Sequence, residues 1–362
     1  MDTNTGNYNP REEDSKTISR IINLLIGVSV LSIILFIGVL YLYIFLSRPA
    51  PEKVQSPMIT LTGETPAPGK TALWNAPDIS LIEDPVLKKQ VEYGKELIAH
   101  TAKYLGPNGS VGQLSNGMNC QNCHLDAGTR HWGNNYGSVA SLYPKFRARS
   151  GTSENIYKRV NDCFERSLNG RALDTLGKEM LAIRAYIEFL GTNVEKGKKA
   201  EGSGFKDLAY LDRAADPVKG KLIYEQKCQS CHQADGQGVL LPDSSEYSFP
   251  PLWGKHSYND GAGLYRLSNF AKYVKYNMPL GATYENPQLS DEEAWDIAAF
   301  VNSQPRPHIN VPKDWPDKSK KPIDHPFGPY ADEFSIEQHK FGPWKPIEEA
   351  RKKQETETKK NI

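Results

Sequence analysis

The chain has 362 residues, enough for two domains with extensions, and 38% of its residues are hydrophobic. Its 25 prolines and 29 glycines are typical of a globular protein with many loops. The formal net charge of +1 gives no argument for a nucleic-acid partner, so no nucleic acid is expected to bind.

The most apolar segment, residues 21–46, lies near the N-terminus and contains no charged side chain. As a helix it would be about 39 Å long, enough to cross a hydrocarbon layer of about 30 Å with tilt. A cleaved signal peptide is the alternative, but its apolar region would have only about 7–15 residues before a small-residue cleavage site. Arg48 and several prolines follow here instead. We therefore expect a retained transmembrane anchor at 21–46, after a disordered N-terminal segment at 1–20.

Proline, glycine and charge mark the segments outside the expected domains. Residues 47–73 contain five prolines and are predicted to form a stiff, extended tether. The stretch 195–207, rich in glycine, lysine and serine, is predicted to be a linker. Beyond residue 305 little periodicity remains, so residues 306–362 are expected to be irregular chain laid over two domains and ending in a solvated tail.

An internal repeat divides the region between the tether and residue 305 into two halves. Segments 91–101 and 218–227 share a Gly-Lys pair followed closely by Leu-Ile, and segments 176–192 and 289–304 share a helical pattern. Aligning the last two segments pairs the following residues: Glu179 with Glu293, Ile183 with Ile297, Ala185 with Ala299, Tyr186 with Phe300, and Ile187 with Val301. The second of these helices has a start signal, Ser290 three residues before Glu293.

Each half carries one C-x-x-C-H motif, CQNCH at 120–124 and CQSCH at 228–232. Two cysteines at this spacing can each add to a vinyl group of one haem, and the histidine then binds the iron. A zinc site would need four ligands, and a redox dithiol would lie in a βαβ pattern, which is absent. The motifs predict two covalently bound haem c groups, attached through these residues: Cys120, Cys123 and His124, and Cys228, Cys231 and His232.

Covalent haem attachment also predicts the compartment. It takes place outside the bacterial cytoplasm, so residues 47–362 are expected on the periplasmic side of the inner membrane and the N-terminus in the cytoplasm. The fold is predicted to be mainly α, with two class I cytochrome c-like haem domains in tandem at 74–196 and 197–305. One transmembrane helix and the proline-rich tether precede them.

The second axial ligand of each iron determines what the haem does. In the second half, Met278 is followed by proline and precedes the last helix, an arrangement that resembles that of the distal methionine in class I cytochromes c, and it stands 19 residues before Ile297. The first half has Cys163 at the corresponding place, 20 residues before Ile183. We therefore expect Met278 and Cys163 to be metal ligands, together with His232 and His124.

Alternatives for the first iron remain open from the residues alone. Cys163 can be a small buried residue while His100 or His131 binds the iron, or the site can be open. Basic residues predominate between 128 and 173 and favour a thiolate and an anion site: Arg130, Lys145, Arg147, Arg149, Lys158, Arg159, Arg166 and Arg171, against Glu154, Asp162 and Glu165. A thiolate stabilises ferric iron and a thioether ferrous iron, so electrons are expected to pass from the first haem to the second.

With these motifs, residues 73–347 resemble the dihaem thiosulfate dehydrogenases, the tetrathionate-forming cytochromes c, and more distantly the SoxA-type cytochromes. The most specific stretches are CQNCHLDAGT, RVNDCFERSLNGRAL, NMPLG and FGPYADEFSIEQHKFGPWKPI. The resemblance implies an enzyme that oxidises two thiosulfates to tetrathionate, sometimes in reverse. It implies His/Cys ligation at the active-site haem and His/Met ligation at the electron-transfer haem, with electrons passing on to a cytochrome c or a membrane-bound redox partner.

By the same resemblance, Cys163 is the essential haem-ligating cysteine, Arg159 and Arg149 are anion-binding residues, and Ser167 is a pocket serine. Some relatives have a lysine before the distal methionine that exchanges with it. Asn277 at this position cannot supply an amine, so plain His232/Met278 ligation is expected.

Two other functions are compatible with two haem motifs. A non-enzymatic c4-like electron carrier that feeds an oxidase would have His/Met ligation at both irons. A dihaem peroxidase would need an iron that opens for peroxide.

Overall fold

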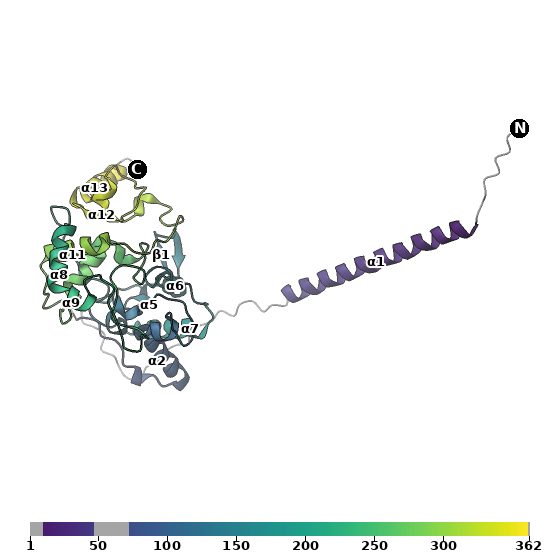
Figure 1. Cartoon of the computed structure of the whole chain (residues 1–362), viewed down its shortest axis with the longest axis horizontal. Helices are drawn as coiled ribbons and strands as arrows, with labels where there is room; N and C mark the ends of the chain where they lie inside the picture. Colours follow the sequence, from purple (N-terminus) through teal and green to yellow (C-terminus); the bar gives the residue numbers. More distant parts are fainter. Residues whose placement is uncertain (1–9, 47–71, 361–362) are drawn as a thin grey trace. The chain divides into compact units, whose positions relative to one another are not determined.

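The computed structural model describes residues 10–46 and 72–360, and the side chains of 19–43 and 72–357. The chain divides into two compact units, Met1–Met58 and Ile59–Ile362 (Figure 1). The expected tether, except its last two residues, lies outside the described residues.

Helix α1 (Pro10–Leu46) makes up the described part of the first unit. Its stretch Ser19–Tyr43 has a mean hydropathy of 2.7 and is long and apolar enough to cross a membrane, as expected. The expected disorder of residues 1–20 is wrong from Pro10 onward. Proline is favoured at the first helical position, and the Arg and Glu residues that follow have high helix propensity.

Helices joined by long loops form the first half of the second unit, which also contains one short hairpin (Figure 1). Its elements in chain order are η1 (Ile79–Leu81), α2 (Pro85–Ala99), α3 (Thr101–Leu105), η2 (Cys120–Asn122), α4 (Leu125–Gly128), α5 (Val139–Leu142), β1 (Lys145–Arg147), β2 (Thr152–Glu154), α6 (Ile156–Arg166) and α7 (Lys178–Leu190). Strands β1 and β2 are antiparallel, with Lys145 opposite Glu154. Helices α2 and α7 pack together over a core that includes Leu97, Phe164 and Tyr186.

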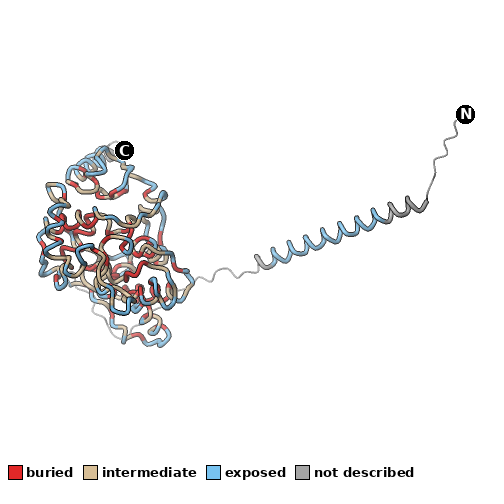
Figure 2. The backbone as a smooth tube through the Cα atoms, in the orientation of Figure 1, coloured by how far each residue is buried: buried red, intermediate tan, exposed pale blue. Residues whose placement is uncertain are grey.

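The second half repeats this arrangement. Its elements are α8 (Pro217–Lys227), α9 (Gln229–His232), β3 (Val239–Leu240), β4 (Tyr247–Phe249), η3 (Gly263–Tyr265), α10 (Leu267–Asn277) and α11 (Asp291–Ser303). Helix α8 packs on α11 over a second core that includes Tyr224, Trp295 and Ile297. Both cores appear as buried segments inside the unit in Figure 2. The expected Ser290–Glu293 capping box begins α11.

The packing of the paired helices confirms the predicted alignment of the two halves. A Cβ atom added to Gly94 in α2 would lie 2.0 Å from the carbonyl oxygen of Ala182 in α7. One added to Gly220 in α8 would lie 1.9 Å from the carbonyl oxygen of Asp296 in α11. Ala182 and Asp296 each precede the aligned isoleucines, so each glycine lets two helices approach at the same point. Asp-Pro pairs begin both α2 and α8, with the aspartate as N-cap.

The segment 195–207, expected to be a linker, is fixed to the first half. Gly202 accepts a hydrogen bond from the backbone N–H of Trp132, and the Ser203 hydroxyl is 2.6 Å from that of Ser138.

Further contacts join the halves directly. The Tyr273 hydroxyl donates to the carbonyl oxygen of Asn122 at 2.6 Å, which ties α10 to the first C-x-x-C-H motif.

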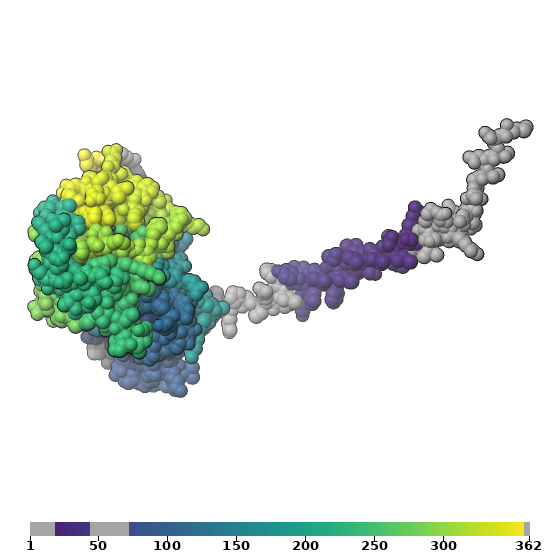
Figure 3. Space-filling view, in the orientation of Figure 1, coloured from purple at the N-terminus to yellow at the C-terminus, as the bar shows by residue number. Residues whose placement is uncertain are grey.

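The extension beyond residue 305 contacts both halves, as expected, and occupies one end of the second unit (Figure 3). Asp314 forms an ion pair with Arg166 of α6, while Trp344 packs on Trp295 of α11 at 4.7 Å between ring centroids. The expected irregular chain is wrong for part of the extension, because α12 (Ile336–Phe341) and α13 (Lys345–Lys360) are helices, although residues 352–357 are exposed as expected for a solvated tail. Buried Ile347 holds α13 in place, and charged residues with high helix propensity extend it.

Candidate functional site

A cavity of about 270 Å³ in the first half brings the first motif and the lone cysteine together. Cys120, Cys123 and His124 line it from η2 and the start of α4, and Cys163 lines it from α6. All five cysteines are free of disulfides. The backbone N–H of Cys120 donates to the Thr101 hydroxyl at 3.0 Å, which fixes the start of the motif against α3.

His124 is held as a neutral imidazole in this cavity. Its Nδ1 atom lies 2.5 Å from the carbonyl oxygen of Asn134, and its ring stacks on Tyr136 with centroids 4.4 Å apart. Burial lowers the pKa of His124 to about 4, so the ring is neutral at physiological pH. Because Nδ1 bonds to a carbonyl oxygen, Nε2 is the nitrogen left for a metal.

Cys163 has a cationic partner one turn away on the same helix. Arg159 donates a hydrogen bond from Nη1 to the sulfur of Cys163 at 3.3 Å. The charge of Cys163 raises the pKa of the Arg159 guanidinium, against the opposing effect of burial. A guanidinium beside a thiol favours the thiolate, the form of cysteine that binds metal and attacks as a nucleophile.

The two histidines that could replace Cys163 as a ligand have other partners. Nδ1 of His100 pairs with Glu246 at 3.0 Å, and Nε2 of His131 bonds to the carbonyl oxygen of Trp74 at 2.6 Å. Neither residue lines the cavity that contains His124 and Cys163. This geometry favours Cys163 over both histidines as a metal ligand.

Other predicted and unpredicted residues complete the surroundings of Cys163. Ser167 lines the same cavity at the C-cap of α6. Three basic residues that the sequence did not single out as site residues also line it: Lys145, Arg147 and Lys199. Alternate residues of a strand share a face, so the spacing of Lys145 and Arg147 was a usable signal. The sequence carries no such signal for Lys199, because this residue lies in the segment that was expected to be a linker.

Arg149 does not line this cavity, unlike Arg159 and Ser167. It follows β1 and lines a neighbouring cavity, where Nη1 donates to the carbonyl oxygen of Gly261 at 3.2 Å. Its Nε atom lies 3.8 Å from Asp314. Burial and the positive charge of Arg166 lower the pKa of Arg149 to about 10, so it stays charged at neutral pH.

A second cavity, of about 350 Å³, contains the second motif. Cys228, Cys231, His232 and Met278 all line it. Nδ1 of His232 lies 2.9 Å from the carbonyl oxygen of Pro250, which again leaves Nε2 for a metal. Burial lowers the pKa of His232 and keeps the ring neutral.

Asn277, next to Met278, is turned away from the second cavity. Its side-chain amide donates to the carbonyl oxygens of Tyr273 at 3.0 Å and Trp132 at 3.3 Å. The expectation that residue 277 supplies no ligand is consistent with these bonds.

The two cavities share part of their walls. Met118, Asn119 and Cys123 line both of them. The first motif is thus built into the wall of the second cavity, and any groups held in the two cavities are close neighbours.

Both halves match known families. Residues 112–195 match the SoxA/TsdA cytochrome c domain, and residues 217–305 match the cytochrome c family. Cytochrome c domains bind haem c covalently, and both cavities fit this cofactor, since each combines two cysteines, a histidine with free Nε2 and a further sulfur side chain.

Curated relatives share most of the chain. The thiosulfate dehydrogenase of Allochromatium vinosum is 37% identical over 67% of this chain and 87% of that protein. That of Psychrobacter arcticus is 37% identical over 71% of this chain and 76% of that protein. A solved thiosulfate dehydrogenase, TsdBA from Marichromatium purpuratum, has a TM-score of 0.60 and 30% identity, covering 65% of this chain and 50% of that one. The chain therefore belongs to the thiosulfate dehydrogenase family of cytochromes c.

Proposed function

We propose that the protein is a membrane-anchored dihaem cytochrome c that oxidises two thiosulfates to tetrathionate and passes the electrons to a cytochrome c or a membrane-bound acceptor. The observation that carries the proposal is the hydrogen bond from Arg159 to Cys163 in the cavity of the first C-x-x-C-H motif. A simple electron carrier has no use for a nucleophilic sulfur among basic side chains.

Two haem c groups are proposed, one attached through Cys120 and Cys123 and the other through Cys228 and Cys231. His124 and Cys163 would hold the first iron, and His232 and Met278 the second. When bound, the haem groups accept the two electrons of the reaction one at a time. As ligands, the thiolate of Cys163 would favour ferric iron and the thioether of Met278 would favour ferrous iron, so electron flow would be favoured from the first site to the second.

The chain's own residues bind and orient the substrate. The basic side chains of Arg159, Lys145 and Arg147 attract the dianion and offset its charge. The Ser167 hydroxyl adds a hydrogen-bond donor at the end of α6. Arg149 acts from the neighbouring cavity, where its charge contributes to the field that attracts anions.

Cys163 can join the two thiosulfates in two steps. Its thiolate first forms a sulfur–sulfur bond with the outer sulfur of one thiosulfate, a step that releases two electrons and gives a cysteine S-thiosulfonate. The outer sulfur of a second thiosulfate then attacks the substrate-derived sulfur of this adduct, forms tetrathionate and returns the thiolate. The sum is two thiosulfate dianions converted to one tetrathionate dianion and two electrons.

Replacement of Cys163 tests this assignment. Cys163→Gly is expected to lower tetrathionate formation by about a thousandfold or more, because it removes both nucleophile and proposed ligand. Turnover is measured by thiosulfate-dependent reduction of the haem groups, and haem attachment by mass spectrometry. The control is Met180→Leu, a buried α7 residue that lines neither haem cavity and should leave turnover unchanged. Turnover by Cys163→Gly with both haems attached would exclude Cys163 as the catalytic residue.

A further inference from the structure

A separate polar cavity of about 260 Å³ lies where both halves meet the C-terminal extension. Arg149 contributes from the first half, residues 260–266 from the second, and residues 308–329 from the extension. No residue lines both this cavity and the one that contains Cys163. It will be called the extension cavity.

Cations outnumber carboxylates in the wall of the extension cavity. The four cationic residues are Arg149, Arg266, Lys318 and Lys321, of which Arg266 is paired with the buried Asp324, and the two carboxylates in the wall are Asp260 and Asp314. Both carboxylates are already engaged. Asp314 accepts hydrogen bonds at 2.9 Å from both terminal nitrogens of Arg166, and Asp260 bonds to His308 and to the backbone N–H of Ile309.

The two lysines retain unused hydrogen-bond donors. Lys318 donates to the carbonyl oxygen of Trp315, and Lys321 donates to those of Phe327 and Pro329. Neither lysine forms an ion pair with any residue that the structure describes. Each ammonium has three donors, so both can bond to a ligand oxygen without losing their present partners.

The positive charges of these side chains also repel one another, which makes the charged form of each less stable. Burial and the charge of Lys318 lower the pKa of Lys321, just as burial and the charge of Arg166 lower that of Arg149. Trp315 is a further donor in the wall, because its indole N–H is buried without a hydrogen-bond partner among the described residues. An anion in the cavity would relieve the repulsion.

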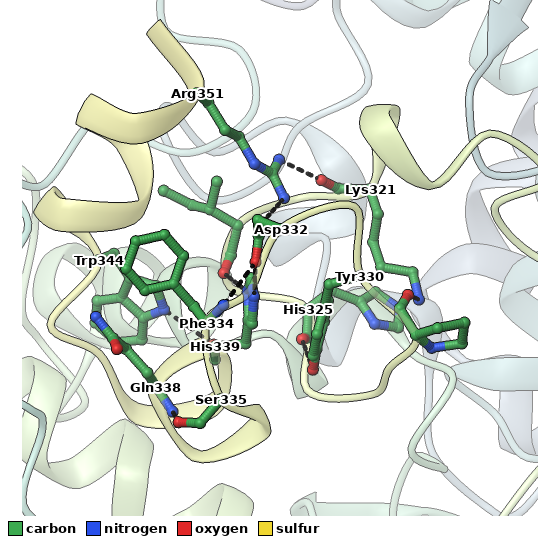
Figure 4. Close-up of polar contacts among 12 residues, drawn as sticks. Lys321, His325, Tyr330, Asp332, Phe334, Ser335, Gln338, His339, Trp344 and Arg351 are labelled. Atoms are coloured by element: carbon green, nitrogen blue, oxygen red, sulfur yellow. Dashed lines mark hydrogen bonds and ion pairs between the residues drawn. The ribbon is translucent and has the colours of Figure 1, made fainter. Parts of the chain in front are cut away.

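The extension holds this wall in place (Figure 4). Arg351 of α13 donates to the carbonyl oxygen of Lys321 at 2.6 Å and to Asp332 at 3.1 Å. The buried His339 bonds through Nε2 to Asp332 and through Nδ1 to the carbonyl oxygen of Ile323. The segment that presents Lys321 is therefore fixed before any ligand binds, which reduces the entropy cost of binding.

We propose that the extension cavity is a second anion site, which binds a tetrahedral oxyanion of sulfur through Lys318, Lys321 and Arg149. The choice of sulfur over other tetrahedral oxyanions rests on the proposed function. A thiosulfate bound there lies outside the cavity of Cys163, beside Asp314, whose ion-pair partner Arg166 belongs to α6, the helix that carries Cys163. The site would thus hold substrate or product anions outside the Cys163 cavity.

Sulfate titration of the haem-loaded Cys163→Gly protein tests the proposal without turnover. Isothermal calorimetry should detect a sulfate site that thiosulfate and tetrathionate compete for. Lys318→Met should weaken this binding about tenfold, the loss expected for one charged hydrogen bond. Lys320→Met, an exposed neighbour in η4 (Lys318–Lys320) outside the cavity wall, is the control and should leave this binding unchanged. Lys145→Met changes a residue proposed to attract anions in the Cys163 cavity, so it should affect only sulfate binding that does not depend on Lys318.

Several outcomes would overturn the proposal. Absence of sulfate binding, equal weakening by Lys318→Met and Lys320→Met, or weakening by Lys145→Met alone would each exclude the site. Phosphate binding without competition by thiosulfate or tetrathionate would exclude sulfur oxyanions as its ligands. Failure of the proposed function can be told apart from failure of the anion site. A wild-type protein without thiosulfate turnover can still bind sulfate in a way that depends on Lys318.

Discussion

At the scale of single residues, the two halves place different sulfur side chains at the same position. Cys163 and Met278 precede their aligned helices by nearly equal distances, and each lines the cavity of its own C-x-x-C-H motif. Arg159 accompanies the cysteine, whereas the neighbour of the methionine, Asn277, bonds to backbone. In the proposed function, this one difference in side chain separates a reactive site from an electron-transfer site.

Replacement of Met278 tests the second site. A thioether ligand favours ferrous iron more than an imidazole does. Met278→His replaces the thioether by an imidazole, so the reduction potential of this haem should fall by more than about 100 mV. A spectroscopic redox titration measures the change. Electron delivery to an external cytochrome c should slow, while reduction by thiosulfate at the first site is retained. An unchanged potential would show that Met278 is not a ligand.

At the scale of elements, the paired helices of each half approach through a glycine. Gly94 and Gly220 stand at equivalent crossings, where a methyl group would overlap a carbonyl oxygen of the facing helix. These crossings position the segments that follow α2 and α8, which carry the attachment motifs. Close helix packing therefore holds the haem cavities in place, and the paired helices also line them, through Ile98 and Ile187 in the first cavity and Tyr224 and Ile297 in the second.

Gly220→Ala tests the second crossing. The added methyl group should force α8 and α11 apart and reduce the free energy of unfolding by about 1–3 kcal/mol. Guanidinium unfolding followed by circular dichroism measures the loss. Gly263→Ala is the control, since its methyl group would meet no atom closer than 4.0 Å and should change stability by less than about 1 kcal/mol. Equal stability of both variants would contradict the close crossing.

At the scale of the whole molecule, one chain combines a candidate membrane helix with a compact haem unit. The extension contacts both halves of that unit and supplies part of the proposed anion site. The anchor would keep electron transfer near a membrane-bound partner. We propose that residues 21–46 are retained in the mature protein, which puts the haem unit on the periplasmic side of the inner membrane.

Cell fractionation tests retention of the helix. The protein is expected in the membrane fraction, released by detergent but not by high salt, with residues 21–46 present in its intact mass. Replacing residues 1–46 with a cleavable signal peptide should give a soluble periplasmic protein with unchanged thiosulfate turnover. A native protein that lacks residues 21–46 by mass would identify this segment as a signal peptide.

Local sequence patterns determined the division of this protein into two halves and the main residues of each cavity. The motifs, the repeat and the apolar run depend on spacing along the chain, and they were sufficient to predict two cytochrome c-like halves and the pairing of each motif with Cys163 or Met278. The ends of the helices were less predictable. Residues 10–20 and 345–360 are charged, and such composition suits a helix as well as a solvated tail.

Only the tertiary structure decided which distant side chains share a cavity. Arg149 and Arg159 are ten residues apart and equally basic, yet they line different cavities because the chain turns between β1 and α6. Likewise, Lys318 and Lys321 meet Arg149 only because Asp314 and Trp344 fix the extension to the two halves. Contacts between segments so far apart leave no periodic signal in the sequence. The extension cavity could therefore not be predicted from the sequence and is seen only in the tertiary structure.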